Sequence, residues 1–203
     1  MIPQLEIRMS WPYNHILADD FSYDDYRKDA DKVIEKHKIN FGKFDRSTRL
    51  FQIAFNKNKI RIPKLIEKYS GFVWRQKYIP IYLVKMTQKP SIADPLTLKF
   101  RDEIDPMLLL VIHELTHLNL PEKMQFEVNN RICEQWVNLI TRNVAINLNI
   151  DMSNPPMRNF DQALELGWDL KKKTLKNFFN DTRKQNSSDL NKPPSVKLHL
   201  RDA

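Results

Sequence analysis

The clearest hydrophobic pattern in the chain is the unbroken apolar run Met107–Ile112, which leads into a segment ending at Leu120. Asp105 and Pro106 stand directly before this run. An aspartate can accept hydrogen bonds from the free amides at a helix start, and proline loses nothing at the first helical position. The pattern therefore predicts a helix that is capped by Asp105 and begins at Pro106. Because nearly all its early residues are apolar, we expect this helix to be buried.

Helical spacing of apolar residues is also present in four other parts of the chain. These predicted helices are the segment from Ser22 up to Asn40, Pro63–Tyr69, Met124–Leu148 and Asp161–Phe179. The third is the longest, and its apolar residues lie on one face at intervals of three and four. We therefore expect it to pack against the core along that face.

Strand patterns are shorter and lie mostly before the apolar helix. Tyr78–Met86 is rich in β-branched and aromatic residues, and Leu96–Phe100 alternates apolar with polar positions. Leu5–Met9 is a weaker strand. Leu50–Phe55 and Lys59–Ile62 resemble two strands joined by the polar turn 56–58, which predicts a hairpin. Together these patterns predict an α+β fold with a small sheet.

Composition places the chain among ordinary globular proteins. It has 203 residues, 41% hydrophobic and 29% charged, which is enough for one domain over residues 1–180. The longest apolar run has six residues, far below a membrane-spanning length, and the first residues lack the pattern of a signal peptide. A single cysteine, Cys133, excludes an internal disulfide. We expect a cytoplasmic protein that does not enter a membrane.

The net charge of +8 is concentrated near the C-terminus. Residues 171–203 contain seven Lys and two Arg against three Asp, so most of the excess positive charge lies there. Polar residues and prolines within residues 181–203 predict a basic, flexible tail. Its vicinity has only Phe178 and Phe179 as aromatic residues, and no nucleic-acid-binding module precedes it. The charge therefore does not by itself indicate a nucleic-acid partner.

The apolar helix also carries the sequence His113-Glu114-Leu-Thr-His117. Two histidines four residues apart lie on the same helix face, so their ring nitrogens can converge on one metal ion. Glu114 then lies beside that ion, where a general base for a metal-bound water belongs. The alternative is an accidental match, but two histidines and a glutamate are costly in an apolar helix unless something compensates them. The pattern indicates a zinc site.

A zinc site that keeps one position open for water needs a third protein ligand. No histidine occurs between His117 and His199, so we expect a carboxylate. The candidates are Glu122, Glu127 and Glu134, and the last two share a helix face because they are seven residues apart.

These motifs resemble the gluzincin metallopeptidases, which carry His-Glu-x-x-His on one helix and a glutamate ligand on a later helix. The family glutamate is often followed four residues later by Asp or Asn, which supports a ligand histidine. Glu134 is followed by Asn138 at this spacing, whereas Glu127 is followed by Arg131. The resemblance therefore implies that His113, His117 and Glu134 bind zinc. It covers about residues 78–148 and is nearest to the minigluzincins, so it implies a zincin-like fold with a small mixed sheet.

The resemblance implies a zinc-dependent peptidase in which Glu114 is the general base and a peptide or protein substrate lies along a sheet edge, which we assign to Leu96–Phe100. Two other interpretations stay open. One is a zincin-fold protein that cleaves little because the tail, through Val196–Leu200 and His199, fills the cleft. The other is a basic nucleic-acid-binding protein with a structural zinc. The missing downstream histidine argues against metzincins and SprT-like proteases.

Overall fold

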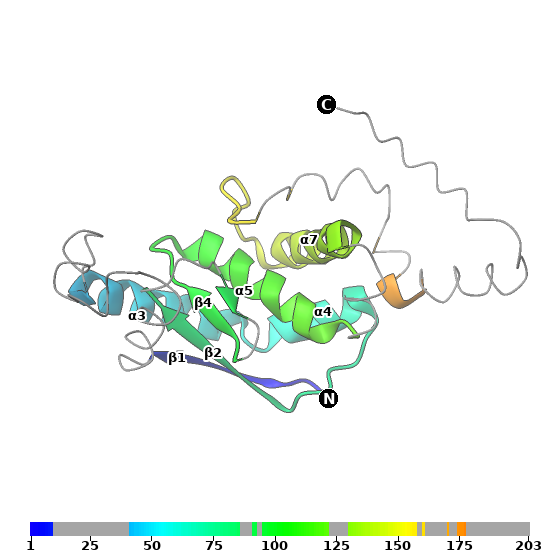
Figure 1. The fold of residues 1–203 in the computed structure, drawn as a ribbon, viewed down its shortest axis with the longest axis horizontal. Coiled ribbons are helices and arrows are strands. Elements are labelled where there is room, and N and C mark those ends of the chain that lie inside the picture. The colour runs from blue at the N-terminus through cyan, green and yellow to red at the C-terminus, as the bar shows by residue number, and fades with distance from the viewer. Residues whose placement is uncertain are drawn as a thin grey trace, which may run out of the picture.

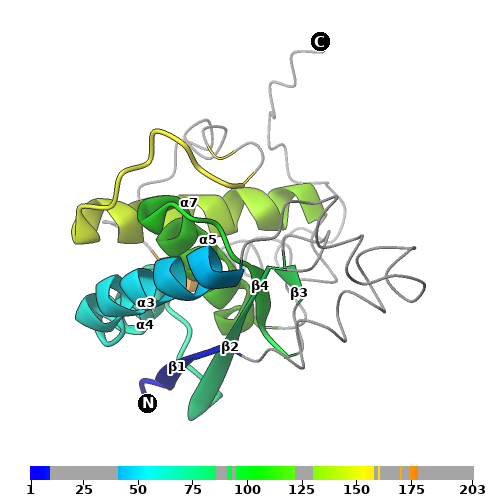
Figure 2. The same cartoon turned by 90° about the vertical axis from the view of Figure 1, so that its left-hand side faces the viewer.

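A mixed four-stranded sheet and four helices make up most of the described part of the protein. The computed structural model describes residues 1–9, 41–85, 91–92, 95–121, 130–157, 160, 170 and 174–177. The strands are β1 (Gln4–Met9), β2 (Tyr78–Val84), β3 (Ser91–Ile92) and β4 (Thr97–Lys99), and the helices are α3 (Phe41–Asn58), α4 (Arg61–Ser70), α5 (Ile104–Asn119) and α7 (Asn130–Leu148). In both views the helices lie on the same side of the sheet (Figures 1 and 2). The prediction of mixed α and β structure with a small sheet is confirmed in this form.

The sheet has the strand order β1-β2-β4-β3. Strands β1, β2 and β4 are parallel, and β3 pairs antiparallel with β4. The register places Leu5 beside Ile79 and Ile7 beside Ile81, and all four side chains are buried. Alternate residues of each strand point to one face, so these pairs give the sheet one apolar face that packs against the helices.

Three of the predicted strands are confirmed, but the predicted edge is wrong. Leu96–Phe100 contains β4, which has β2 on one side and β3 on the other. The edge at this end of the sheet, among the described residues, is therefore β3. A two-residue strand is too short to produce a visible alternation, which explains why the sequence pattern missed it.

Helix α5 is the centre of the helical layer and contacts α3, α4 and α7. Its buried residues include the whole apolar run that was singled out in the sequence, Met107–Ile112. The predicted start is wrong, because Glu103 is the N-cap and the helix begins at Ile104. Pro106 is still in the first turn, where its missing N–H has no acceptor within the helix. Asp105 instead accepts a hydrogen bond from the backbone N–H of Asp151 at 3.1 Å.

The predicted hairpin over residues 50–62 is also wrong, because this region forms the end of α3 and the start of α4. Phe44, Phe51 and Phe55 are fully buried and lie at helical intervals on one face of α3. Phe100 packs edge-on against Phe44 and Phe51, with ring centroids 5.4 and 6.0 Å apart. The aliphatic residues within 50–62 suggested strands. The helical spacing of the phenylalanines over the longer segment 44–55 instead indicates a helix. The helix predicted at Pro63–Tyr69 is confirmed within α4.

Several other predictions concern residues whose structure is not described. The helix after Ser22, most of Asp161–Phe179 and the tail 181–203 fall outside the described residues. The helix predicted over Met124–Leu148 is confirmed from Asn130 onward as α7. Among the described residues, no helix has both the length and the apolar character that a membrane crossing requires.

Candidate metal centre

Helices α5 and α7 pack side by side in opposite directions. At one end, Asp105 at the start of α5 binds the backbone of Asp151, just after α7. At the other end, His113 and His117 of α5 meet Glu134 near the start of α7. The local cause is the helical period, which puts the two histidines one turn apart on the face that looks toward α7. The predicted ligands are thus brought together from two helices.

The side chains of His113, His117 and Glu134 lie at the corners of a triangle, in which each carboxylate oxygen of Glu134 contacts a different histidine. The Nε2 atoms of His113 and His117 are 3.3 Å apart. Glu134 places Oε2 at 3.4 Å from Nε2 of His113 and Oε1 at 3.2 Å from Nε2 of His117. Among the described residues, these three side chains form a group that lies close enough together to share one metal ion.

These distances fit a metal ion the size of zinc. In a tetrahedral site with metal–ligand bonds of about 2.0–2.1 Å, neighbouring ligand atoms are about 3.3–3.4 Å apart. Two imidazoles and one carboxylate are also a donor set that zinc accepts. The carboxylate supplies only acceptors, and a neutral imidazole presents a lone pair at one of its nitrogens. Converging acceptors repel one another unless a proton or a cation lies between them.

The exposure of the three ligands increases from one side of the site to the other. The side chain of His113 is 7% exposed, that of His117 is 23% exposed and that of Glu134 is 51% exposed. The histidine rings meet nearly edge to face, with centroids 4.9 Å apart and an angle of 75°. The site is therefore buried on the side of His113 and open to solvent beside Glu134.

The electrostatics of the protein without a metal show how strongly this position favours positive charge. Burial lowers the pKa of His117, but hydrogen bonds with Cys133 and Glu134 and the charges of Glu134 and Glu114 raise it to about 10. Hydrogen bonds from His113 and His117 hold the pKa of Glu134 far below its ordinary value. Both pKa shifts favour a shared proton between His117 and Glu134 in the metal-free protein, and a metal ion bound here would compete with that proton.

The remaining predicted residues lie around this triangle. Glu114 is half-buried on α5, beside His113, and its charge acts on His117. Asn138 is buried one turn after Glu134 on α7, and Nδ1 of His113 is a buried atom without a hydrogen-bond partner among the described residues. Support of a ligand histidine by Asn138 stays a prediction. Glu122 and Glu127 lie outside the described residues.

Cys133 is a feature of the site that the sequence analysis did not anticipate. It precedes Glu134 on α7, is buried and forms a hydrogen bond with His117. In the sequence it served only to exclude an internal disulfide, and no role in the site was assigned to it. Its position next to a candidate ligand was the available signal, although adjacency on a helix does not show that two side chains face the same neighbour.

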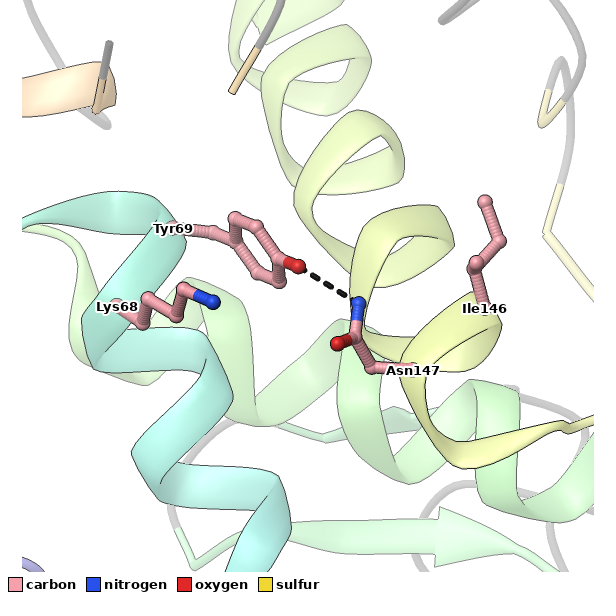
Figure 3. Close-up of a pocket in the computed structure, with 4 residues that line it drawn as sticks. All are labelled: Lys68, Tyr69, Ile146 and Asn147. Carbon is pink, nitrogen blue, oxygen red and sulfur yellow. Dashed lines mark hydrogen bonds between the residues drawn. The ribbon is translucent and has the colours of Figure 1, made fainter. Parts of the chain in front are cut away.

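A surface pocket lies at the far end of α7, away from the triangle. It is lined by Lys68 and Tyr69 of α4 and by Ile146 and Asn147 of α7 (Figure 3). Asn147 follows Glu134 by 13 residues, which corresponds to about 20 Å along a helix. The amide Nδ2 of Asn147 donates to the hydroxyl oxygen of Tyr69 at 2.6 Å. In this pocket the donor of Asn147 therefore already has an acceptor, and the four lining residues do not form a cluster of metal-binding side chains.

Comparisons with known proteins do not add to these observations. No protein-family model matches the chain, and no match was found among curated proteins or among solved structures. The site is therefore interpreted from its own residues.

Proposed function

We propose that the protein is a zinc-dependent metallopeptidase with a zincin-like fold. The observation that carries the proposal is the triangle of His113, His117 and Glu134, whose nitrogen–nitrogen and nitrogen–oxygen distances of 3.2 to 3.4 Å are compatible with a shared zinc ion. Glu114 follows the first histidine on the same helix, which is the position of a general base in His-Glu-x-x-His enzymes. Cytoplasmic location and a peptide or protein substrate are parts of the same proposal.

The order of the elements supports a zincin-like fold. Parallel strands and an antiparallel edge strand precede the helix with both histidines, and the helix with the glutamate follows. In such a fold the substrate is held as an additional strand on the sheet edge, where backbone hydrogen bonds bind any extended peptide. The strand order favours β3 over β4 for this role, because both sides of β4 are already paired.

The residues of the site would share the reaction as follows. A bound zinc ion makes water more acidic and polarises a carbonyl oxygen. His113, His117 and Glu134 would hold that ion while the open side beside Glu134 admits water and peptide. Glu114 would take a proton from the attacking water as its oxygen bonds to the peptide carbonyl carbon. Glu114 would then give this proton to the leaving nitrogen as the C–N bond breaks.

A metal analysis combined with a peptide-cleavage assay tests the proposal. We expect one equivalent of zinc in the purified protein, cleavage of casein or a fluorogenic peptide, loss of cleavage with a chelator and recovery with zinc. Asn147→Ala is the matched control, because it alters the same helix about 20 Å away. Absence of zinc binding would contradict the proposal as a whole. Zinc binding without cleavage of either substrate would instead support a zincin-fold protein that is not an active peptidase.

A further inference from the structure

A buried polar cluster holds the end of α5, next to the proposed metal site. Asn119 is 2% exposed and lies two residues after His117. Its Oδ1 accepts a hydrogen bond from the hydroxyl of Ser70 at 2.5 Å, and its Nδ2 donates to the backbone oxygen of Phe72 at 3.0 Å. The hydroxyl oxygen of Ser70 also accepts from the backbone N–H of Phe72 at 3.1 Å. The Asn119 amide thus joins α5 to the connection between α4 and β2.

Gly71 gives that connection its shape. It ends α4 in the left-handed conformation, with φ of 77°, and its N–H donates to the carbonyl of Glu67 at 2.9 Å. This turn lets Ser70 and Phe72, on either side of it, both reach the Asn119 amide. A Cβ at Gly71 would lie only 2.6 Å from Oγ1 of Thr174, so a larger residue is excluded by space as well as by φ.

A second contact holds the residue that follows α5. Arg75 donates from Nη2 to the carbonyl of Leu120 at 3.3 Å, and the N–H of Leu120 bonds to the carbonyls of His117 and Thr116. The last turn of a helix leaves carbonyls without partners and tends to fray. His117 lies in this last turn, whereas His113 lies one turn deeper and is more buried. His117 is therefore the histidine whose position depends on how the helix end is held.

We propose that Asn119 and Ser70 are positioning residues that fix His117 relative to Glu134 and thereby set the affinity and geometry of the metal site. This inference rests on the proposed metal-binding function. Metal ligands must be held within about 0.5 Å of their working geometry by the groups around them. The Ser70–Asn119 hydrogen bond meets this need because it is buried and connects residues 49 positions apart, so a local unwinding of the helix end would break it.

The test compares two buried hydroxyls that are each removed with little change of shape. Ser70→Ala breaks the bond to Asn119, whereas Thr48→Val removes the hydroxyl that donates to the carbonyl of Phe44 within α3. Zinc affinity is measured by competition with a chromophoric chelator, cobalt coordination by visible absorption, and the unfolding temperature in the presence of a chelator. We expect Ser70→Ala to weaken zinc binding about 10- to 100-fold, the range typical of residues that support ligands, and to alter the cobalt spectrum.

The control should lower the unfolding temperature to a similar extent but keep wild-type zinc affinity and cobalt spectrum. Ser70→Cys retains a weak donor, so it should lie between Ser70→Ala and the wild type, and it provides the comparison if Ser70→Ala does not fold. Wild-type affinity and spectrum in the Ser70 variants would overturn the positioning role. An equal loss of affinity in Thr48→Val would overturn it too. If the wild-type protein binds neither zinc nor cobalt, the proposed function fails, and the positioning role fails with it.

Discussion

Polar side chains are paired differently at the two ends of the α5–α7 helix pair. The near end carries His113, His117 and Glu134, and the far end carries Asp105 and Asn147. At the far end, donors meet acceptors: Asp105 accepts from the Asp151 backbone, and Asn147 donates to Tyr69 (Figure 3). At the near end, the Nε2 atoms of His113 and His117 and both carboxylate oxygens of Glu134 lie within 3.2 to 3.4 Å of a neighbouring acceptor-capable atom. The far end is complete without any added group. The near end needs a proton or a cation to be stable.

The difference shows why burial or polarity alone does not identify a site. Both ends carry polar side chains of α5 and α7, and the far end, where Tyr69 of α4 also takes part, has the surface pocket. What separates them is the balance of donors and acceptors, since an unmatched cluster of acceptors is unstable unless a positive charge compensates it. Mutations that act at one end and not at the other can therefore test the comparison.

The largest effect is expected from Glu114→Gln. The amide preserves the shape of the side chain but cannot take a proton from water, so peptide cleavage should fall by about 10²- to 10⁴-fold. Zinc content should stay at the wild-type level, because Glu114 is outside the triangle of ligand atoms. The measurement is the cleavage rate of a fluorogenic peptide together with metal analysis. A Glu114→Gln protein of wild-type activity would rule out Glu114 as the general base.

Glu134→Ala should affect metal binding most strongly. It removes one corner of the triangle, so zinc affinity should fall by more than the roughly 100-fold that is typical of supporting residues. Competition with a chelator measures the affinity. Glu127→Ala and Asn147→Ala are the controls, and both should keep wild-type affinity. The opposite ranking of Glu127→Ala and Glu134→Ala would transfer the third ligand to Glu127.

The histidines of the candidate metal site could be predicted from the sequence, because their arrangement depends on residues that are close together in the chain. The four-residue spacing of His113 and His117 fixes their relation on any helix. Spacing alone left Glu127 and Glu134 open, and the resemblance to the gluzincins, through Asn138, favoured Glu134. The structure brings Glu134 to both histidines. The strands β1, β2 and β4 were also predicted from local sequence, with β-branched and aromatic content indicating β2 and alternation indicating β4.

Features that depend on distant partners were missed. Residues 50–62 were assigned to a hairpin because the aromatic face of α3 becomes meaningful only when Phe100 packs against it. The N-cap of α5 was placed at Asp105, whose side chain instead accepts a hydrogen bond from the backbone of Asp151, 46 residues later. The hydrogen bond between Ser70 and Asn119 spans 49 residues and has no local signature. Tertiary contacts override local propensity at each of these positions.

An intermediate effect should be visible in the pH dependence of the metal-free protein. The pKa of Glu134 is lowered on folding from 4.5, so its contribution to stability is present above that pH and is lost as the pH falls below it. The pKa of His117 is raised from 6.5 to about 10, so its contribution is complete below pH 6.5 and is lost as the pH rises toward 10. Stabilisation by this pair should therefore be greatest between about pH 4.5 and 6.5.

Thermal unfolding in the presence of a chelator, recorded across this range for the wild type and for Glu134→Gln, measures the effect. The substitution should reduce the difference in unfolding temperature between pH 6 and pH 10. The change should be modest, because the Glu134 side chain is about half exposed and solvent screens its charge. A pH profile that is identical in the two proteins would mean that His117 and Glu134 are not coupled.

The smallest effect is expected at the far end, from Tyr69→Phe. The ring of Tyr69 is buried and should keep its packing, so the variant loses only the hydroxyl that accepts a hydrogen bond from Asn147. A hydrogen bond of this kind contributes about 0.5–1.5 kcal/mol to stability, and Asn147 is exposed enough to bond to water instead, so the loss should be near the lower limit. Chemical denaturation measures this loss. Zinc affinity should be unchanged, because the substitution leaves the Ser70–Asn119 hydrogen bond intact and Asn147, which loses its acceptor, lies about 20 Å along α7 from Glu134. A loss of zinc affinity in Tyr69→Phe would show that the two ends of the helix pair are coupled.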